Sequence, residues 1–181
     1  DYTTGPVLWG SAGTLGQHSF HQLLHQGQLL CPVDFVLPLT THTGMAQQHL
    51  NLVANCLAQS RTLMVGRSLK AAKDALLQRG LDNKKAEDLA PHLVMPGNRP
   101  SSVITMESLN PTTLGALLAL YEHRTFCSAR LWKINPFDQW GVELGKEISV
   151  GISQKLQEKD NRNTMDGATE RLIQRWKKAQ K

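Results

Sequence analysis

The sequence predicts an α/β protein: a three-layer parallel sheet flanked by helices, followed by a C-terminal helical tail. Short apolar runs of β type alternate with longer helical stretches, which is typical of parallel βαβ units. The 181 residues suffice for one domain with a hydrophobic core. A composition of 40% apolar and 19% charged residues is that of a globular chain.

The predicted elements follow in chain order. Strands are expected at residues 6–9, 33–37, 102–106 and 131–134. Helices are expected at about 14–26 and 47–64, as a charged pair between 68 and 89, at 112–125, from near 138, and from about 168. The "PGNRP" stretch at 96–100 has turn composition. Because only five residues precede the first strand, we expect the N-terminus to fall inside a sheet domain. That domain is expected to cover residues 1–158. Residues 159–181 are expected to form a polar segment and the last helix.

Two helices carry apolar residues that we expect to be buried. The stretch 112–125 is apolar nearly all round, which is typical of a buried helix. In the helix after Asp138, which is a suitable N-cap, an i, i+4 stripe forms the expected core face. The stripe consists of Trp140, Leu144, Ile148 and Ile152.

The charge pattern limits the kinds of partner that we expect, and the cysteine content indicates the compartment. The formal net charge is +5, and the densest basic stretch, "RWKKAQK", is typical of a solvated helix end. Basic residues interleaved with aromatic ones are missing, which argues against nucleic acid. No apolar run is long enough to span a bilayer, so no membrane partner is expected. Three widely spaced cysteines favour a reducing compartment, the cytoplasm.

The stretch "GSAGTLGQH" at residues 10–18 allows several interpretations: a phosphate loop, a proton-transfer histidine, a metal site or a tight turn. Its glycines fall as G-x-x-G-x-x-G, unlike the G-x-G-x-x-G of dinucleotide loops. Thr14 and Gln17 have capping-box spacing, which predicts a helix start there. His18 would then lie in the first turn, where the helix dipole favours a neutral ring that can relay a proton.

Helical projection separates apolar and histidine faces in this segment. Phe20, Leu23 and Leu24 fall on one face, and His18, His21 and His25 fall on the opposite one. His21 and His25 at i, i+4 could share a metal, but no third ligand is obvious, so no metal is expected. A surface histidine stripe is the simpler expectation for these two residues.

Gln139 and Lys146 are seven residues apart and share the face opposite the apolar stripe. Seven residues make about 10 Å of helical rise. An amide and an ammonium at that spacing could hold two ends of one small polar ligand, or could simply be solvated.

Several strings resemble one enzyme family. "FDQWGVELGK" at 137–146 resembles the C-terminal signature of the glucose-6-phosphate isomerases. "TGPVLWG", "GTLGQHSFHQLLHQG", "ANCLAQS", "GNRPSS" and "LGALLALYEH" resemble further segments of that family in the same order. The resemblance covers nearly the whole chain and weakens after about residue 160.

The resemblance implies a fold and a reaction. The family interconverts glucose 6-phosphate and fructose 6-phosphate through a cis-enediol, without a cofactor, in glycolysis and gluconeogenesis. It uses two SIS-type sugar isomerase domains, here incomplete at the N-terminus, and works as a homodimer. His18 matches the histidine that assists ring opening and reaches into the partner subunit's site. Lys146 matches a lysine at ring opening, and Gln139 a glutamine at the sugar-phosphate site.

Two departures from the family pattern bear on this interpretation. Ser11, Ala12 and Leu15 stand where the family loop usually has Glu, Pro and Asn, which we expect to alter loop packing. None of the carboxylates present matches the family's glutamate base, which is expected upstream of Asp1. We therefore expect this chain to need the N-terminal remainder for activity. The alternatives are a non-catalytic sugar-phosphate-binding SIS module and an interaction domain.

Overall fold

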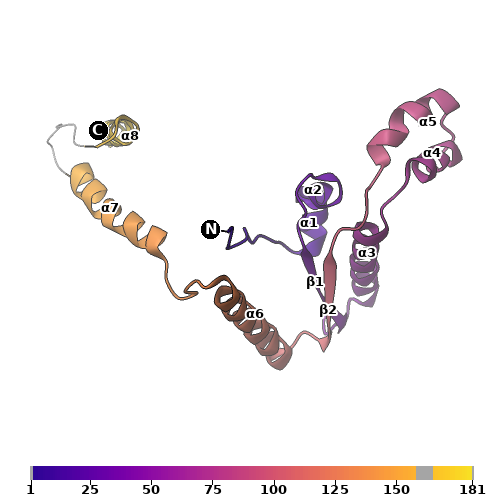
Figure 1. Cartoon of the computed structure of the whole chain (residues 1–181), viewed down its shortest axis with the longest axis horizontal. Helices are drawn as coiled ribbons and strands as arrows, with labels where there is room; N and C mark the ends of the chain where they lie inside the picture. Colours follow the sequence, from indigo (N-terminus) through magenta and orange to yellow (C-terminus); the bar gives the residue numbers. More distant parts are fainter. Residues whose placement is uncertain (1, 158–164, 181) are drawn as a thin grey trace. The chain divides into compact units, whose positions relative to one another are not determined.

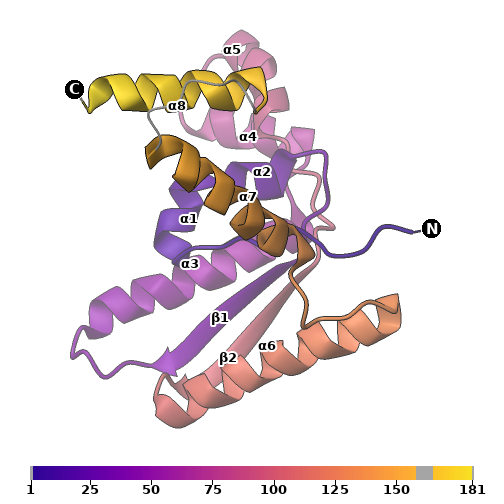
Figure 2. The same cartoon turned by 90° about the vertical axis from the view of Figure 1, so that its left-hand side faces the viewer.

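The structure is a computed structural model that describes residues 2–157 and 165–180. The chain divides into two compact units, residues 1–123 and 124–181, and each is described by itself. Figures 1 and 2 label the elements. The first unit contains α1 Gly13–Ser19, α2 His21–Gln26, β1 Val33–Thr40, α3 Ala46–Val65, α4 Leu69–Gln78, α5 Asn83–Leu89, the 3-10 helix η1 Ala90–Leu93 and β2 Ser101–Ser108. Helix α6 Pro111–Trp132 begins in this unit, and α7 Trp140–Gln157 and α8 Gly167–Ala179 belong to the second.

The described residues form a two-stranded parallel sheet. Strand β1 pairs with β2 in a register that runs from Val33 opposite Ser101 to Thr40 opposite Ser108. The connection between them runs through α3, α4, α5 and η1, as a parallel pair requires. Helix α3 packs on both strands (Figure 2) and buries Leu63 to 1% exposure. The predicted α/β class, with helices flanking a parallel sheet, is confirmed, and both central strands lie where they were predicted.

The other two predicted strands are wrong. Residues 6–9 have no regular structure, and Val7 remains 86% exposed. Residues 131–134 lie at the end of α6, where Lys133 takes a φ of 59° and the amide of Ile134 bonds to the carbonyl of Ala129 at 3.0 Å. A short apolar run does not distinguish a strand from the last turn of a helix, and here the helix continued.

The charged pair of helices between β1 and β2 is confirmed as α4 and α5. Each starts at a side-chain cap, with Ser68 accepting from Ala71 and Asp82 accepting from Lys85. Together with η1 they enclose a small core of Ala72, Leu76, Ala86 and Ala90. The predicted turn after η1 is also confirmed. Gly97 takes a φ of +68° there, and a Cβ on the neighbouring Gly66 would collide with the carbonyl oxygen of Met95.

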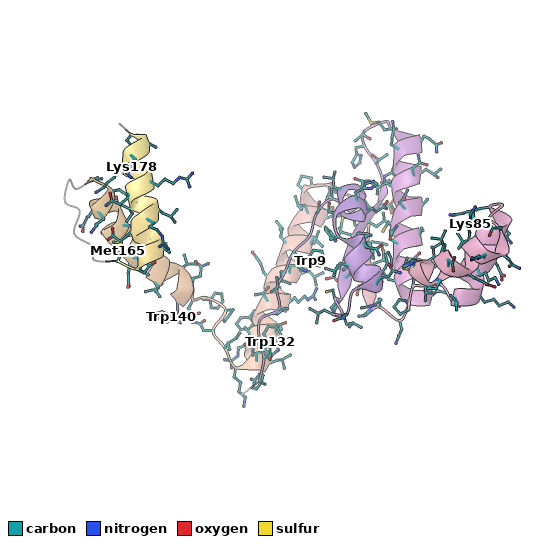
Figure 3. All side chains as sticks on the ribbon, turned by 90° about the horizontal axis from the view of Figure 1, so that it is seen from above. Trp9, Lys85, Trp132, Trp140, Met165 and Lys178 are labelled. Atoms are coloured by element: carbon teal, nitrogen blue, oxygen red, sulfur yellow. The ribbon has the colours of Figure 1, made fainter. Side chains whose placement is uncertain are left out.

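The predicted burial of two helices is wrong for this structure. In α6, Leu118 and Leu120 are 58% and 51% exposed, because a two-stranded sheet offers too little surface to cover an all-round apolar helix. In α7, Trp140 and Ile148 are 72% and 53% exposed, and Trp140 stands at the start of the helix (Figure 3). Helix α8 contacts the opposite end of α7, through Lys155, where Ile152 is half-buried, and the other three residues of the stripe remain exposed.

The two helices of the second unit begin near the predicted positions, at Trp140 and Gly167. Helix α7 starts at Trp140, and the carbonyl of Gln139, not the side chain of Asp138, receives the first-turn amides of Val142 and Glu143. Asp166 caps α8, and hydrogen bonds from Thr169 lower the pKa of its carboxyl group. The predicted domain boundary at 158/159 lies outside the described residues. Among the described helices, none is both long enough and apolar enough to cross a bilayer.

A buried ion pair joins α7 to α8. The ammonium of Lys155 lies 3.1 Å from Oε1 of Glu170, and the two side chains are 7% and 9% exposed. We expect Glu170→Ala to lower the free energy of opening of α8 by about 3 kcal/mol, because it removes the buried carboxylate that faces a buried ammonium.

Hydrogen exchange of the α8 amides measures this loss. The double variant Lys155→Met/Glu170→Leu should lose less of the free energy of opening of α8, because neither charge of the buried pair remains. Glu147→Ala, on the exposed surface of α7, is the matched control. Equal exchange in Glu170→Ala and the control would contradict a stabilising ion pair.

Candidate functional site

The glycine-rich loop leads directly into α1. The helix starts at Gly13, and the amides of Leu15 and Gly16 bond to the carbonyl of Ala12 at 3.0 and 2.9 Å. The capping box is therefore wrong, because the helix begins one residue before Thr14 and has no side-chain cap. Gly16 is buried, and a Cβ there would lie 2.9 Å from Cζ of Phe20. This glycine permits the close approach of the next turn.

A break at Phe20 divides the predicted helix into two. Phe20 takes φ −141°, and its amide bonds to the carbonyl of Gly16 at 3.0 Å, so α1 ends at Ser19 and α2 starts at His21. His18 consequently lies in the last turn of α1, not the first. The predicted dipole effect is wrong, since His18 meets the negative end of a short helix. Its side chain is exposed and forms no hydrogen bond with the described residues.

His21 and His25 are buried, contrary to the predicted surface stripe. Their exposures are 7% and 8%, whereas Leu23, expected in the core, is 53% exposed. Both rings bond to Oε1 of Gln59 on α3, His21 through Nδ1 at 3.2 Å and His25 through Nε2 at 2.8 Å. The helix break changes the phase of the buried face, and the amide of Gln59 satisfies the imidazoles there.

Aromatic rings continue this packing on the first unit. The ring of Trp9 lies edge-on to that of Phe20, with centroids 4.5 Å apart, and Figure 3 shows Trp9 beside the α1–α2 segment. His21 in turn lies edge-on to Phe35 of β1, with centroids 6.4 Å apart. The α1–α2 segment is therefore held between the N-terminal segment and the sheet.

Gln139 and Lys146 both belong to the second unit, on either side of the start of α7. Gln139 immediately precedes α7, and Lys146 lies seven residues further along the chain, inside the helix. Both side chains are exposed. Because Gln139 lies before the first residue of α7, its placement on one helix face with Lys146 stays a prediction, and His18 belongs to the other unit. Among the described residues, no group of three or more histidine, cysteine or acidic side chains could hold a metal.

Sequence reasoning missed two residues that hold the His18 segment. Gln59 lies in α3, and Arg99 donates to the carbonyl of Gly27 at 2.6 Å, just after α2. Asn55 and Gln59 share the i, i+4 spacing of His21 and His25, which is the one signal that could have indicated facing polar residues.

Comparisons with known proteins cover almost the whole chain. A sequence model of the family described as "Phosphoglucose isomerase" matches residues 1–173. The chain is 49% identical over 180 residues to a glucose-6-phosphate isomerase of Hahella chejuensis, covering 99% of this chain and 32% of that protein. It is 50% identical over 177 residues to the one of Marinomonas sp., covering 98% of this chain and 32% of that protein.

A solved structure of the same family also matches this chain. A crystal structure of a glucose-6-phosphate isomerase from Chlamydia trachomatis superposes with a TM-score of 0.70 at 33% identity. The match covers 100% of this chain and 31% of the other. This chain spans about a third of the length of the relatives it matches. The match over residues 1–173 shows that the chain belongs to the phosphoglucose isomerase family.

Proposed function

We propose that this chain acts as the C-terminal part of a glucose-6-phosphate isomerase. The enzyme interconverts glucose 6-phosphate and fructose 6-phosphate, an aldose–ketose isomerisation in glycolysis and gluconeogenesis. The family match over residues 1–173 carries this proposal. The chain supplies His18 and Lys146 for opening of the sugar ring and Gln139 for binding of the sugar phosphate.

Ring opening requires proton transfers at two oxygens. The proton of the C1 hydroxyl leaves as the C1 carbonyl forms, the bond from C1 to the ring oxygen breaks, and the ring oxygen takes up a proton. An imidazole can both accept and donate a proton near neutral pH, which suits His18 to this exchange. An ammonium only donates, so Lys146 would stabilise negative charge that develops on oxygen. The exposure of both side chains supports access to a substrate.

The isomerisation itself moves a proton between C1 and C2. Removal of the C2 proton from the open aldose, with protonation of the C1 oxygen, gives the cis-enediol. Return of a proton to C1, with loss of the proton on the C2 hydroxyl, gives the ketose. This step needs a positioned base, which we assign to a glutamate in another part of the isomerase. The reaction is redox-neutral overall and needs no cofactor.

The enzyme is proposed to be a cytoplasmic homodimer whose site is shared between subunits. The exposed stripe of α7, with Trp140 at 72% and Leu144 at 56%, supports coverage by other parts of the isomerase.

The cysteines support the proposed compartment. All three are free, as in a reducing compartment, and burial raises the pKa of the Cys56 thiol.

Isomerisation in D2O tests this function. We expect the isomerase that contains this chain to convert glucose 6-phosphate to fructose 6-phosphate and to incorporate deuterium at C1 of the ketose, because the proton taken from C2 exchanges with solvent on the base before a proton is delivered to C1. NMR follows both changes. Conversion with complete retention of hydrogen would contradict the enediol. Binding of glucose 6-phosphate without conversion would favour a non-catalytic SIS module.

A further inference from the structure

We propose that a polar seam between the α1–α2 segment and α3 positions His18 for ring opening. The seam consists of Gln17, His21 and His25 on one side and Asn55 and Gln59 on the other. This inference rests on the proposed role of His18. It adds three side chains of the segment and two of α3 as positioning residues that do not touch the substrate.

The seam joins residues of matching spacing. Gln17 donates to Oδ1 of Asn55 at 3.3 Å, and one turn further His21 and His25 share Oε1 of Gln59 at 3.2 and 2.8 Å. Spacings of four residues on both sides align the contacts along the two helices. The seam passes through the break at Phe20 and so holds α1 and α2 to the same partner.

The shared oxygen fixes one arrangement of the buried rings. A carboxamide oxygen has two lone pairs and can accept two N–H groups, so His21 donates through Nδ1 and His25 through Nε2. In the part of the chain that the structure describes, Nδ1 of His25 is buried without a hydrogen-bond partner. In the tautomer that carries the proton on Nε2, this Nδ1 has a lone pair and no N–H group, so no buried donor is left unpaired. Sliding either helix would leave buried N–H groups unpaired, which costs the full desolvation of those groups.

The short helices depend on such contacts for their direction. Helix α1 has seven residues and α2 has six, too few to hold their direction in isolation. His18 lies between Gln17 and His21, two residues whose side chains are anchored in the seam. The far end of α2 is fixed independently, because Nε2 of Gln26 donates to the carbonyl of Val94 at 2.7 Å. The seam therefore anchors the residue before His18 and the third residue after it, and in this way sets where its imidazole points.

Gln59→Leu in the full isomerase tests the proposal. Leucine has similar volume but no acceptor. Catalytic efficiency is measured with glucose 6-phosphate and with an analogue that lacks hydroxyls at C4 and C5 and cannot close a five- or six-membered ring. We expect kcat/KM to fall by about tenfold or more for the cyclic sugar and by less than about threefold for the open analogue, because a small misplacement of His18 slows only ring opening.

Control variants separate positioning from general stability. Gln59→Glu keeps an acceptor for both rings and should retain cyclic activity within about threefold. Leu76→Ala weakens the small α4–α5 core and should leave the ratio of the two activities unchanged. The double variant His18→Ala/Gln59→Leu should lose no more kcat/KM for the cyclic sugar than His18→Ala alone, because Gln59 acts through His18.

The outcomes distinguish the two proposals. If His18→Ala lowers both activities equally, the role of His18 is wrong. If His18→Ala is selective for the cyclic sugar but folded Gln59→Leu is not, or Gln59→Glu fails to preserve activity, the seam proposal is overturned. If Gln59→Leu does not fold, Asn55→Leu at the exposed end of the seam decides. A selective loss of about threefold supports the seam, and an unchanged ratio contradicts it.

Discussion

Replacing His18 by alanine in the isomerase that contains this chain should lower kcat/KM for glucose 6-phosphate by about 10²- to 10⁴-fold, the usual contribution of a positioned acid–base group. The open analogue should lose no more than about threefold, because it bypasses the step in which His18 acts. The exposed imidazole forms no hydrogen bond with the described residues, so the substitution removes reactivity without breaking a buried contact. Initial rates with the two substrates measure the difference.

His42→Ala is the matched control for His18→Ala. His42 is also an exposed histidine of the first unit, and it lies in the loop between β1 and α3. We expect its substitution to change neither rate by more than about twofold. An equal loss with both substrates in His18→Ala would assign this histidine to the enediol step or to binding instead.

Lys146→Met should lower kcat/KM for glucose 6-phosphate by about 10²-fold, because the thioether keeps the length of the side chain but cannot donate a hydrogen bond or carry charge. Lys146 is exposed on α7, so the loss is not one of core packing. The loss of kcat/KM measured with the open analogue should again be much smaller. Steady-state kinetics with both substrates provide the measurement.

Two further variants sharpen the test of Lys146. Lys146→Arg keeps the charge but changes the donor geometry, so it should recover only part of the activity. Lys84→Met, on the exposed face of α5, should leave both rates unchanged. Loss of binding with an unchanged kcat in Lys146→Met would place the ammonium at the phosphate rather than at ring opening.

The central elements of the fold could be predicted because their signals are local. Strand β1 is a β-type run bounded by turn residues, and α4 begins at a serine cap that the sequence displays. The boundary at Phe20 could not be predicted in this way. The break depends on the buried approach of Gly16 to the Phe20 ring, a contact that is visible only in three dimensions.

The site could be predicted in part for the same reason. Helical periodicity correctly placed Lys146 in a helix, but Gln139 lies just before α7, so the common face of the two residues remains a prediction. The burial of His21 and His25 depends on Gln59, which is 38 and 34 residues away along the chain. Their own helix indicated a surface stripe, because periodicity does not report a polar partner on a neighbouring helix.

The apolar pattern of α6 and α7 indicated burial that this structure does not supply. Leu118 and Leu144 are 58% and 56% exposed, and the chain spans about a third of the length of its relatives. The pattern therefore predicts which surfaces need covering without identifying what covers them. We have proposed that other parts of the isomerase do so.

A crystal structure of the isomerase with bound glucose 6-phosphate in its cyclic form tests the central claim most directly. The account predicts a ring nitrogen of His18 and the Nζ of Lys146 within about 2.7–3.2 Å of the ring oxygen or the C1 hydroxyl. It also predicts the Gln139 amide against the phosphate or a sugar hydroxyl. A productively bound cyclic sugar with neither His18 nor Lys146 within reach of those two oxygens would contradict it.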